Sequence, residues 1–167
     1  HGGIAVTVST DESFQPDIAA IEAAITEKTR AIIINSPNNP SGAIYPSERL
    51  AALGELLGRK EMEHGSEIFI ISDEPYRRII YDGLSYPQVF PHHPGTIVVN
   101  SHAKDLALPG ERIGYMAVNP DYRDKAELAD GLTFCNRMLG FVNAPALMQH
   151  VVRALQGVSV DPLEYQR

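Results

Sequence analysis

Short apolar segments alternate with amphipathic segments along most of the chain. Isoleucines recur at a helical spacing within residues 17–29, and Pro16 fits the first turn of the predicted helix. A β-branched run, Ala31–Ile34, follows and ends in turn residues, so it predicts a buried strand. Ser47 then precedes leucines that share one apolar face, which predicts a second helix with Ser47 as its cap.

Three further apolar runs also predict strands. They are Ile68–Ile71, Thr96–Val99 and Ile113–Val118. Residues 74–95 form a long, proline-containing connection between Ile68–Ile71 and Thr96–Val99. A connection of this length is typical of functional or mobile segments. From Tyr122 onward the pattern is mostly helical. The predicted helices alternate with strands that are apolar along their whole length. This pattern predicts an α/β fold, a three-layer α/β/α arrangement with a mainly parallel sheet.

The composition narrows the class of protein. Of 167 residues, 44% are hydrophobic and 21% are charged, which is typical of a globular protein and predicts one domain over residues 1–167. The formal net charge of −7 argues against a general binder of nucleic acid or anionic membranes. The apolar runs are too short to span a bilayer, and the single cysteine, Cys135, favours a reducing, cytoplasmic compartment.

Polar side chains follow each of the first three predicted strands. They include Asn35 and Asn39 after the first, Asp73 and Tyr76 after the second, and Ser101 and Lys104 after the third. Ligands of parallel sheets bind beyond the carboxyl ends of the strands, so we expect these side chains to converge on one crevice. A tight turn through Pro109 and Gly110 lets Arg112 return towards the same place.

The chemistry of this set fits a phosphorylated pyridine aldehyde. Lys104 supplies an amine that becomes nucleophilic when it is desolvated. Arg112 and Ser101 suit a phosphate, and Asp73 suits a protonated ring nitrogen. The donors that suit a phenolate oxygen are Tyr76 and Asn39.

Three strings resemble, in sequence and in order, the class I/II aminotransferases of fold type I, the aspartate aminotransferase superfamily. They are Asn35–Gly42 (NSPNNPSG), Ser72–Tyr76 (SDEPY) and Ser101–Gly114 (SHAKDLALPGERIG). These enzymes use pyridoxal 5′-phosphate (PLP), and the lysine string with its downstream arginine is their specific signature. The resemblance covers essentially the whole chain, as the central part of the family's PLP-binding large domain.

The resemblance implies a role for each residue of the set. Lys104 would form a Schiff base with PLP and, once displaced, would move a proton between the substrate and the cofactor as base and then acid. Asp73 would keep the pyridine nitrogen protonated, so that the ring accepts electrons from the substrate. Two pairs complete the site: Asn39 and Tyr76 at the phenolate oxygen, and Ser101 and Arg112 at the phosphate. The resemblance also implies that the bond from Asn39 to the following proline is cis.

Some positions depart from the usual family pattern. His102 stands where an apolar or small residue is usual, Ala103 where a second serine or threonine is frequent, and Pro75 where a small residue commonly packs on the cofactor. Asn100 or His102 could make the hydrogen bonds assigned to Ser101. These departures point to a subgroup distinct from the aspartate-specific archetype.

Ordinary structural roles stay open for several of these residues. Asp73 could cap a loop, and Arg112 could form a surface ion pair. The arginines at 77–78 could steer anions or remain solvated. His92 and His93 suggest a metal, but no third ligand follows at a useful spacing, so no metal is expected.

The sequence therefore predicts a PLP-dependent aminotransferase, which transfers an amino group from an amino acid to a 2-oxo acid. We recognise neither the family's N-terminal segment nor its C-terminal small domain, so we expect weak PLP binding and poor turnover from this chain alone. The full-length parent is expected to be a homodimer. Another PLP reaction, such as C–S β-elimination or racemisation, would use the same residues. A non-catalytic binding or dimerisation domain is the alternative from another class.

Overall fold

The computed structural model describes residues 2–158 as helices and strands around one sheet. In chain order they are α1 (Ile18–Ala24), β1 (Ala31–Asn35), α2 (Ser47–His64), β2 (Phe69–Asp73), η1 (Phe90–His92), β3 (Thr96–Ser101), α3 (His102–Asp105), η2 (Pro109–Glu111), β4 (Gly114–Val118), α4 (Lys125–Met138) and α5 (Ala146–Ala154). The strands lie in the order β1-β2-β3-β4. The first three are parallel and β4 is antiparallel to β3, so the predicted α/β fold with a mainly parallel sheet is confirmed.

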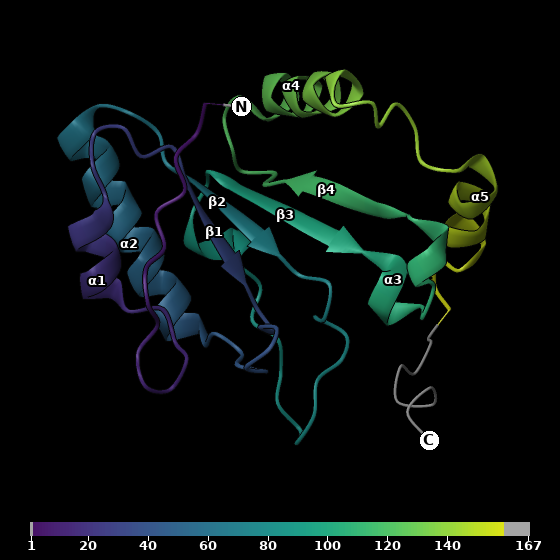
Figure 1. Cartoon of the computed structure of the whole chain (residues 1–167), viewed down its shortest axis with the longest axis horizontal. Coiled ribbons are helices and arrows are strands. Elements are labelled where there is room, and N and C mark those ends of the chain that lie inside the picture. The colour runs from purple at the N-terminus through teal and green to yellow at the C-terminus, as the bar shows by residue number, and fades with distance from the viewer. Residues whose placement is uncertain (1, 159–167) are drawn as a thin grey trace.

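The register of the strands sorts their side chains onto two faces, because successive residues of a strand point to opposite sides. Ile34, Ser72 and Val98 lie in register on the face that is buried. On the opposite face, Ile33 is 73% exposed and Met116 is 44% exposed. Figure 1 shows α1 and α2 together on one side of the sheet and α4 beside β4.

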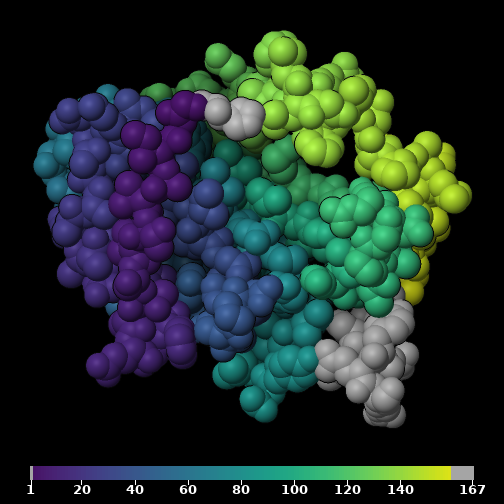
Figure 2. All heavy atoms as spheres, viewed as in Figure 1, coloured from purple at the N-terminus to yellow at the C-terminus, as the bar shows by residue number. Residues whose placement is uncertain are grey.

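The core lies between the covered face and these two helices. Its aliphatic members come from α1, α2, the first two strands and the residues that flank them: Ile21, Ile25, Ile34, Leu50, Leu53, Leu56, Leu57, Ile68, Ile70 and Val89. The leucines of α2 share one face of the helix, since they recur every three or four residues. The N-terminal segment also packs here through Val8, and Figure 2 shows this segment in purple beside the blue atoms of residues that follow it in the chain.

Two predicted helix starts are wrong in detail. The first helix begins at Ile18, and its cap is Asp17, whose side chain accepts from the Ala20 amide, so Pro16 lies before the cap. Ser47 is not a cap but the first residue of α2, because the extended Pro46 occupies the cap position. The Ser47 hydroxyl instead lies 3.5 Å from His92 Nε2.

The first helix is also shorter than predicted. It ends at Ala24, because Ile25 takes an extended backbone, although its side chain still enters the core. The connection between β2 and β3 is irregular apart from turns and η1, as predicted. Within residues 2–158, no helix combines the length and the hydropathy needed to cross a membrane.

Candidate active site

The carboxyl ends of β1 and β2 bring Asn35 beside Asp73. These residues are partners in the strand register, and Asn35 Nδ2 donates to the Asp73 carbonyl at 3.0 Å and to Asp73 Oδ2 at 3.2 Å. Burial raises the pKa of Asp73 above its usual value. The carboxylate is thus oriented by a neutral amide and is half-buried, so a cationic partner would lower its raised pKa.

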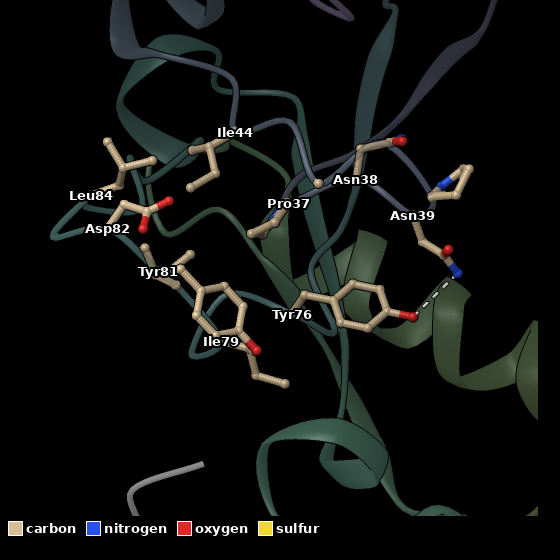
Figure 3. Close-up of a pocket in the computed structure, with 12 residues that line it drawn as sticks. Pro37, Asn38, Asn39, Ile44, Tyr76, Ile79, Tyr81, Asp82 and Leu84 are labelled. Atoms are coloured by element: carbon tan, nitrogen blue, oxygen red, sulfur yellow. Dashed lines mark hydrogen bonds between the residues drawn. The ribbon is translucent and has the colours of Figure 1, made fainter. Parts of the chain in front are cut away.

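The loop after β1 places Asn39 against Tyr76. Asn39 Nδ2 donates to the Tyr76 hydroxyl at 3.3 Å, a contact visible in Figure 3. Asn35 also holds this loop, because its Oδ1 accepts from the Asn39 amide at 2.9 Å. The Ser36–Pro37 and Asn39–Pro40 bonds are both cis, so the expectation for the second is confirmed.

Lys104 lies over the ring of Tyr76. Its Nζ is 5.8 Å from the ring centroid, which is within the range of a cation–π contact. The lysine is exposed and belongs to α3, which follows β3 directly. Three segments that are distant in sequence therefore bring an amide, a phenol and an amine to one place.

The two residues predicted to bind phosphate are less closely assembled. Ser101 caps α3, and its hydroxyl accepts from the Ala103 amide at 3.1 Å. Arg112 is exposed and takes a left-handed backbone with φ of 50° after the turn of η2. Among the described residues, its guanidinium donates to the Pro109 carbonyl at 3.0 Å and does not reach the Ser101 hydroxyl.

A buried acidic residue follows Asp73 directly. Glu74 is 2% exposed, accepts from the Ser72 hydroxyl at 2.9 Å, and lies 3.8 Å from Arg77 NH1. Burial raises the pKa of Glu74, and burial together with the Glu74 charge raises that of Tyr86. Arg77 is therefore paired and half-buried, which corrects the expectation of a solvated side chain.

Sequence reasoning missed one residue of this site as a functional contributor. Asn35 orients both Asp73 and Asn39, yet at the level of the sequence it was only one of several polar residues after a strand. The available signal was its position as the last residue of β1, since the ends of neighbouring parallel strands share one edge.

A cavity of about 460 Å³ opens next to the contact between Asn39 and Tyr76 (Figure 3). Its lining consists of Pro37, Asn38, Asn39, Pro40, Gly42, Ile44, Tyr76, Ile79, Ile80, Tyr81, Asp82 and Leu84. Most of these side chains are apolar, and two of the predicted cofactor residues form part of the wall. Lys104 and Asp73 lie outside this lining, so the cavity adjoins the candidate site without enclosing it.

The fold is that of an α/β domain with a mainly parallel sheet, and sequence comparison gives the family. Residues 1–159 match the profile of aminotransferase class I and II, so the chain belongs to this family. The resemblance seen in the three strings is thereby confirmed.

Relatives of known name agree with this assignment. The chain is 44% identical over 118 residues to the aspartate/prephenate aminotransferase of Thermus thermophilus, covering 68% of this chain and 29% of that protein. It is 32% identical over 173 residues to the aspartate aminotransferase of Geobacillus stearothermophilus, covering 99% of this chain and 40% of that protein. An amino transferase structure from Eubacterium rectale has a TM-score of 0.89 and 47% identity, over 95% of this chain and 40% of that one. The chain thus spans less than half the length of these relatives.

Proposed function

We propose that this chain is the cofactor-binding part of a PLP-dependent aminotransferase, which passes an amino group from an amino acid to a 2-oxo acid. The proposal is supported by family membership and by one geometric observation. Lys104 Nζ lies 5.8 Å from the Tyr76 ring, and the hydroxyl of that ring lies 3.3 Å from Asn39 Nδ2. An amine beside two donors suits an aldehyde that stands next to a phenolate oxygen.

The roles of the side chains follow from their chemistry and position. PLP, when bound, supplies an aldehyde and a ring that accepts electrons from the substrate carbon. Lys104 would hold PLP through the aldehyde carbon, with the aldehyde oxygen leaving as water, and its amine, when free, would take a proton from the substrate and return it at another atom. Asp73 holds a proton on the ring nitrogen, a role that its half-buried carboxylate suits because a cation would lower its raised pKa. Asn39 and Tyr76 donate to the phenolate oxygen.

The phosphate is assigned to Ser101 and Arg112. The Ser101 hydroxyl keeps a free proton to donate, because its contact with the Ala103 amide uses it only as an acceptor. Arg112 has to leave the Pro109 carbonyl, a change that an exposed side chain makes at small cost. The resulting guanidinium–phosphate contact is of the charge-assisted type.

Covalent trapping tests this proposal directly. The chain is incubated with PLP and then with borohydride, and the modified lysines are located by mass spectrometry of its peptides. We expect the label at Lys104 to exceed that at Lys28 and Lys125, two exposed lysines away from the site, and to vanish in Lys104→Ala. Lys28→Ala is the matched control and should leave the label at Lys104 unchanged. Equal labelling of all exposed lysines would contradict the proposal.

Substrates and assembly belong to the same proposal. We infer a homodimer for the longer protein, and amino acids with 2-oxo acids as its substrates. Transfer that depends on an added 2-oxo acid would support aminotransferase activity, whereas pyruvate release from a sulfur-containing amino acid would show a lyase instead. Sedimentation of the longer protein measures its assembly, and a monomer at micromolar concentration would contradict the homodimer.

A further inference from the structure

The segment that follows Tyr76 is tied to the short helix that carries Lys104. Arg78 NH1 lies 3.9 Å from Asp105 Oδ2, and the same oxygen lies 3.3 Å from His102 Nδ1. The Asp105 side chain is 6% exposed, whereas that of Arg78 is 51% exposed. A carboxylate this buried, next to the site lysine, receives its cationic contact from the segment that presents Tyr76.

A second contact joins the same two regions through β4. The guanidinium carbon of Arg77 lies 5.9 Å from the centroid of the Tyr115 ring, and that ring lies 5.8 Å from the His102 ring. Arg77 also forms an ion pair with Glu74, in which Arg77 NH1 lies 3.8 Å from Glu74 Oε2. The residues that flank Tyr76 and the residues that flank Lys104 are therefore connected by two independent paths.

Helix α3 depends on such contacts because it is very short. It has only 4 residues, His102 to Asp105, and a single turn is not stable on its own. The other Asp105 oxygen, Oδ1, is buried and has no hydrogen-bond partner within residues 2–158. Burial of a half-satisfied carboxylate is unfavourable, so its remaining contacts, to Arg78 and His102, carry the stabilisation of the turn.

We propose that Arg78, Asp105 and His102 are positioning residues that hold Lys104 against Tyr76. The proposal rests on the proposed function, because it gives these residues a purpose in presenting the lysine. None of them reaches the Tyr76 hydroxyl or the lysine amine in a described contact, so they act through the backbone of α3 and of residues 76–78. His102, which departs from the usual family pattern, is thereby assigned to orienting the carboxylate of Asp105.

The test measures the reactivity of Lys104 without any cofactor. The full chain is treated briefly with a limiting amount of acetic anhydride, and acetylation at Lys104 is divided by acetylation at Lys28 in the same molecules. Asp105→Asn and Arg78→Ala should each raise this ratio, by about three- to tenfold, because loss of the contact between Arg78 and Asp105 releases the lysine amine from the Tyr76 ring. PLP trapping at Lys104 should fall by a similar factor.

Two comparisons separate positioning from a general loss of stability. Arg123→Ala removes an ion pair with Glu67 outside the site, and it should leave the ratio unchanged even where thermal stability falls. Arg78→Lys should restore the wild-type ratio, since one N···O contact is all that the arginine makes with Asp105.

A double-mutant cycle completes the test. If Arg78 and Asp105 act through each other, the double variant should raise the ratio no more than Asp105→Asn alone. Additive effects, or a ratio that neither single variant changes, would overturn the positioning role. If PLP labels no lysine selectively while the acetylation ratio responds as expected, the proposed function fails. The positioning of Lys104 by Arg78 and Asp105 is then still supported.

Discussion

The face of the sheet that α1 and α2 cover is packed with aliphatic side chains, whereas the opposite face carries polar ones where the strands end. Ile34 and Ile70 on the first face are 6% and 0% exposed. Asn35 follows Ile34 in β1, and Asp73 follows the buried Ser72 in β2. Because side chains alternate along a strand, both residues belong to the other face, where they are half-buried. The same strands therefore serve two purposes, separated by the alternation of their side chains.

This difference shows that the covered face stabilises the fold, whereas the opposite face carries the polar groups of the candidate site. Apolar burial is non-directional and scales with area, so the covered face stabilises the sheet whatever lies on the other side. The polar face keeps its groups in hydrogen bonds that orient them and leave part of their surface open. Substitutions on the two faces should accordingly differ in kind as well as in size.

The largest effect is expected from Leu53→Ala on the covered side. Leu53 is fully buried in the core of α2, and its truncation should lower the free energy of unfolding by about 3 kcal/mol. Urea denaturation followed by circular dichroism measures the change. Ile33→Ala on the opposite face is the control and should cost less than about 0.5 kcal/mol, since Ile33 is 73% exposed. Equal losses in the two variants would refute the contrast between the faces.

A smaller loss is expected from Gly54→Ala in the same helix. A Cβ at position 54 would collide with the backbone carbonyl of His92, so α2 and η1 have to move apart at a cost of about 2 kcal/mol. Gly58→Ala, in the same helix but facing open space, is the matched control and should stabilise the chain by up to about 1 kcal/mol. Thermal unfolding of both variants provides the measurement, and a destabilised Gly58→Ala would contradict this interpretation.

The smallest effect is expected on the polar face, from Asp73→Asn. Burial raises the pKa of Asp73, so the folded state binds its proton more tightly than the unfolded state does. Stability from this group is therefore fully present below its unfolded pKa and is lost as the pH rises through its folded pKa. At neutral pH the asparagine variant should be at least as stable as the wild type, by less than about 1 kcal/mol, because its amide avoids the buried charge.

The measurement is denaturant unfolding of both chains from acidic to neutral pH. The advantage of Asp73→Asn should shrink towards acidic pH, where the wild-type carboxyl is protonated. A variant that is less stable than the wild type at neutral pH would show that a cationic partner already compensates the Asp73 charge.

Several features of the fold and site were readable from the residues alone. The apolar runs located the four strands found within residues 2–158, because they are rich in β-branched and other apolar residues that favour strands. The order of the three polar strings indicated which residues could meet, and Asn39, Tyr76 and Lys104 do meet. The end of α1 was not readable, since Ile25 continues the helical spacing while the backbone has already become extended.

The sequence by itself determined the alternation of strands and helices, the family and the residue types that the site requires, because these follow from local patterns and from the identity of side chains. Only the tertiary structure decided how these groups are oriented: Asn35 on Asp73, Arg78 on Asp105, and Arg112 on the Pro109 carbonyl. A charged or amide side chain has many acceptable partners in a chain of this composition. Which one it contacts depends on distances between segments that are far apart in sequence, and those distances exist only once the sheet has formed.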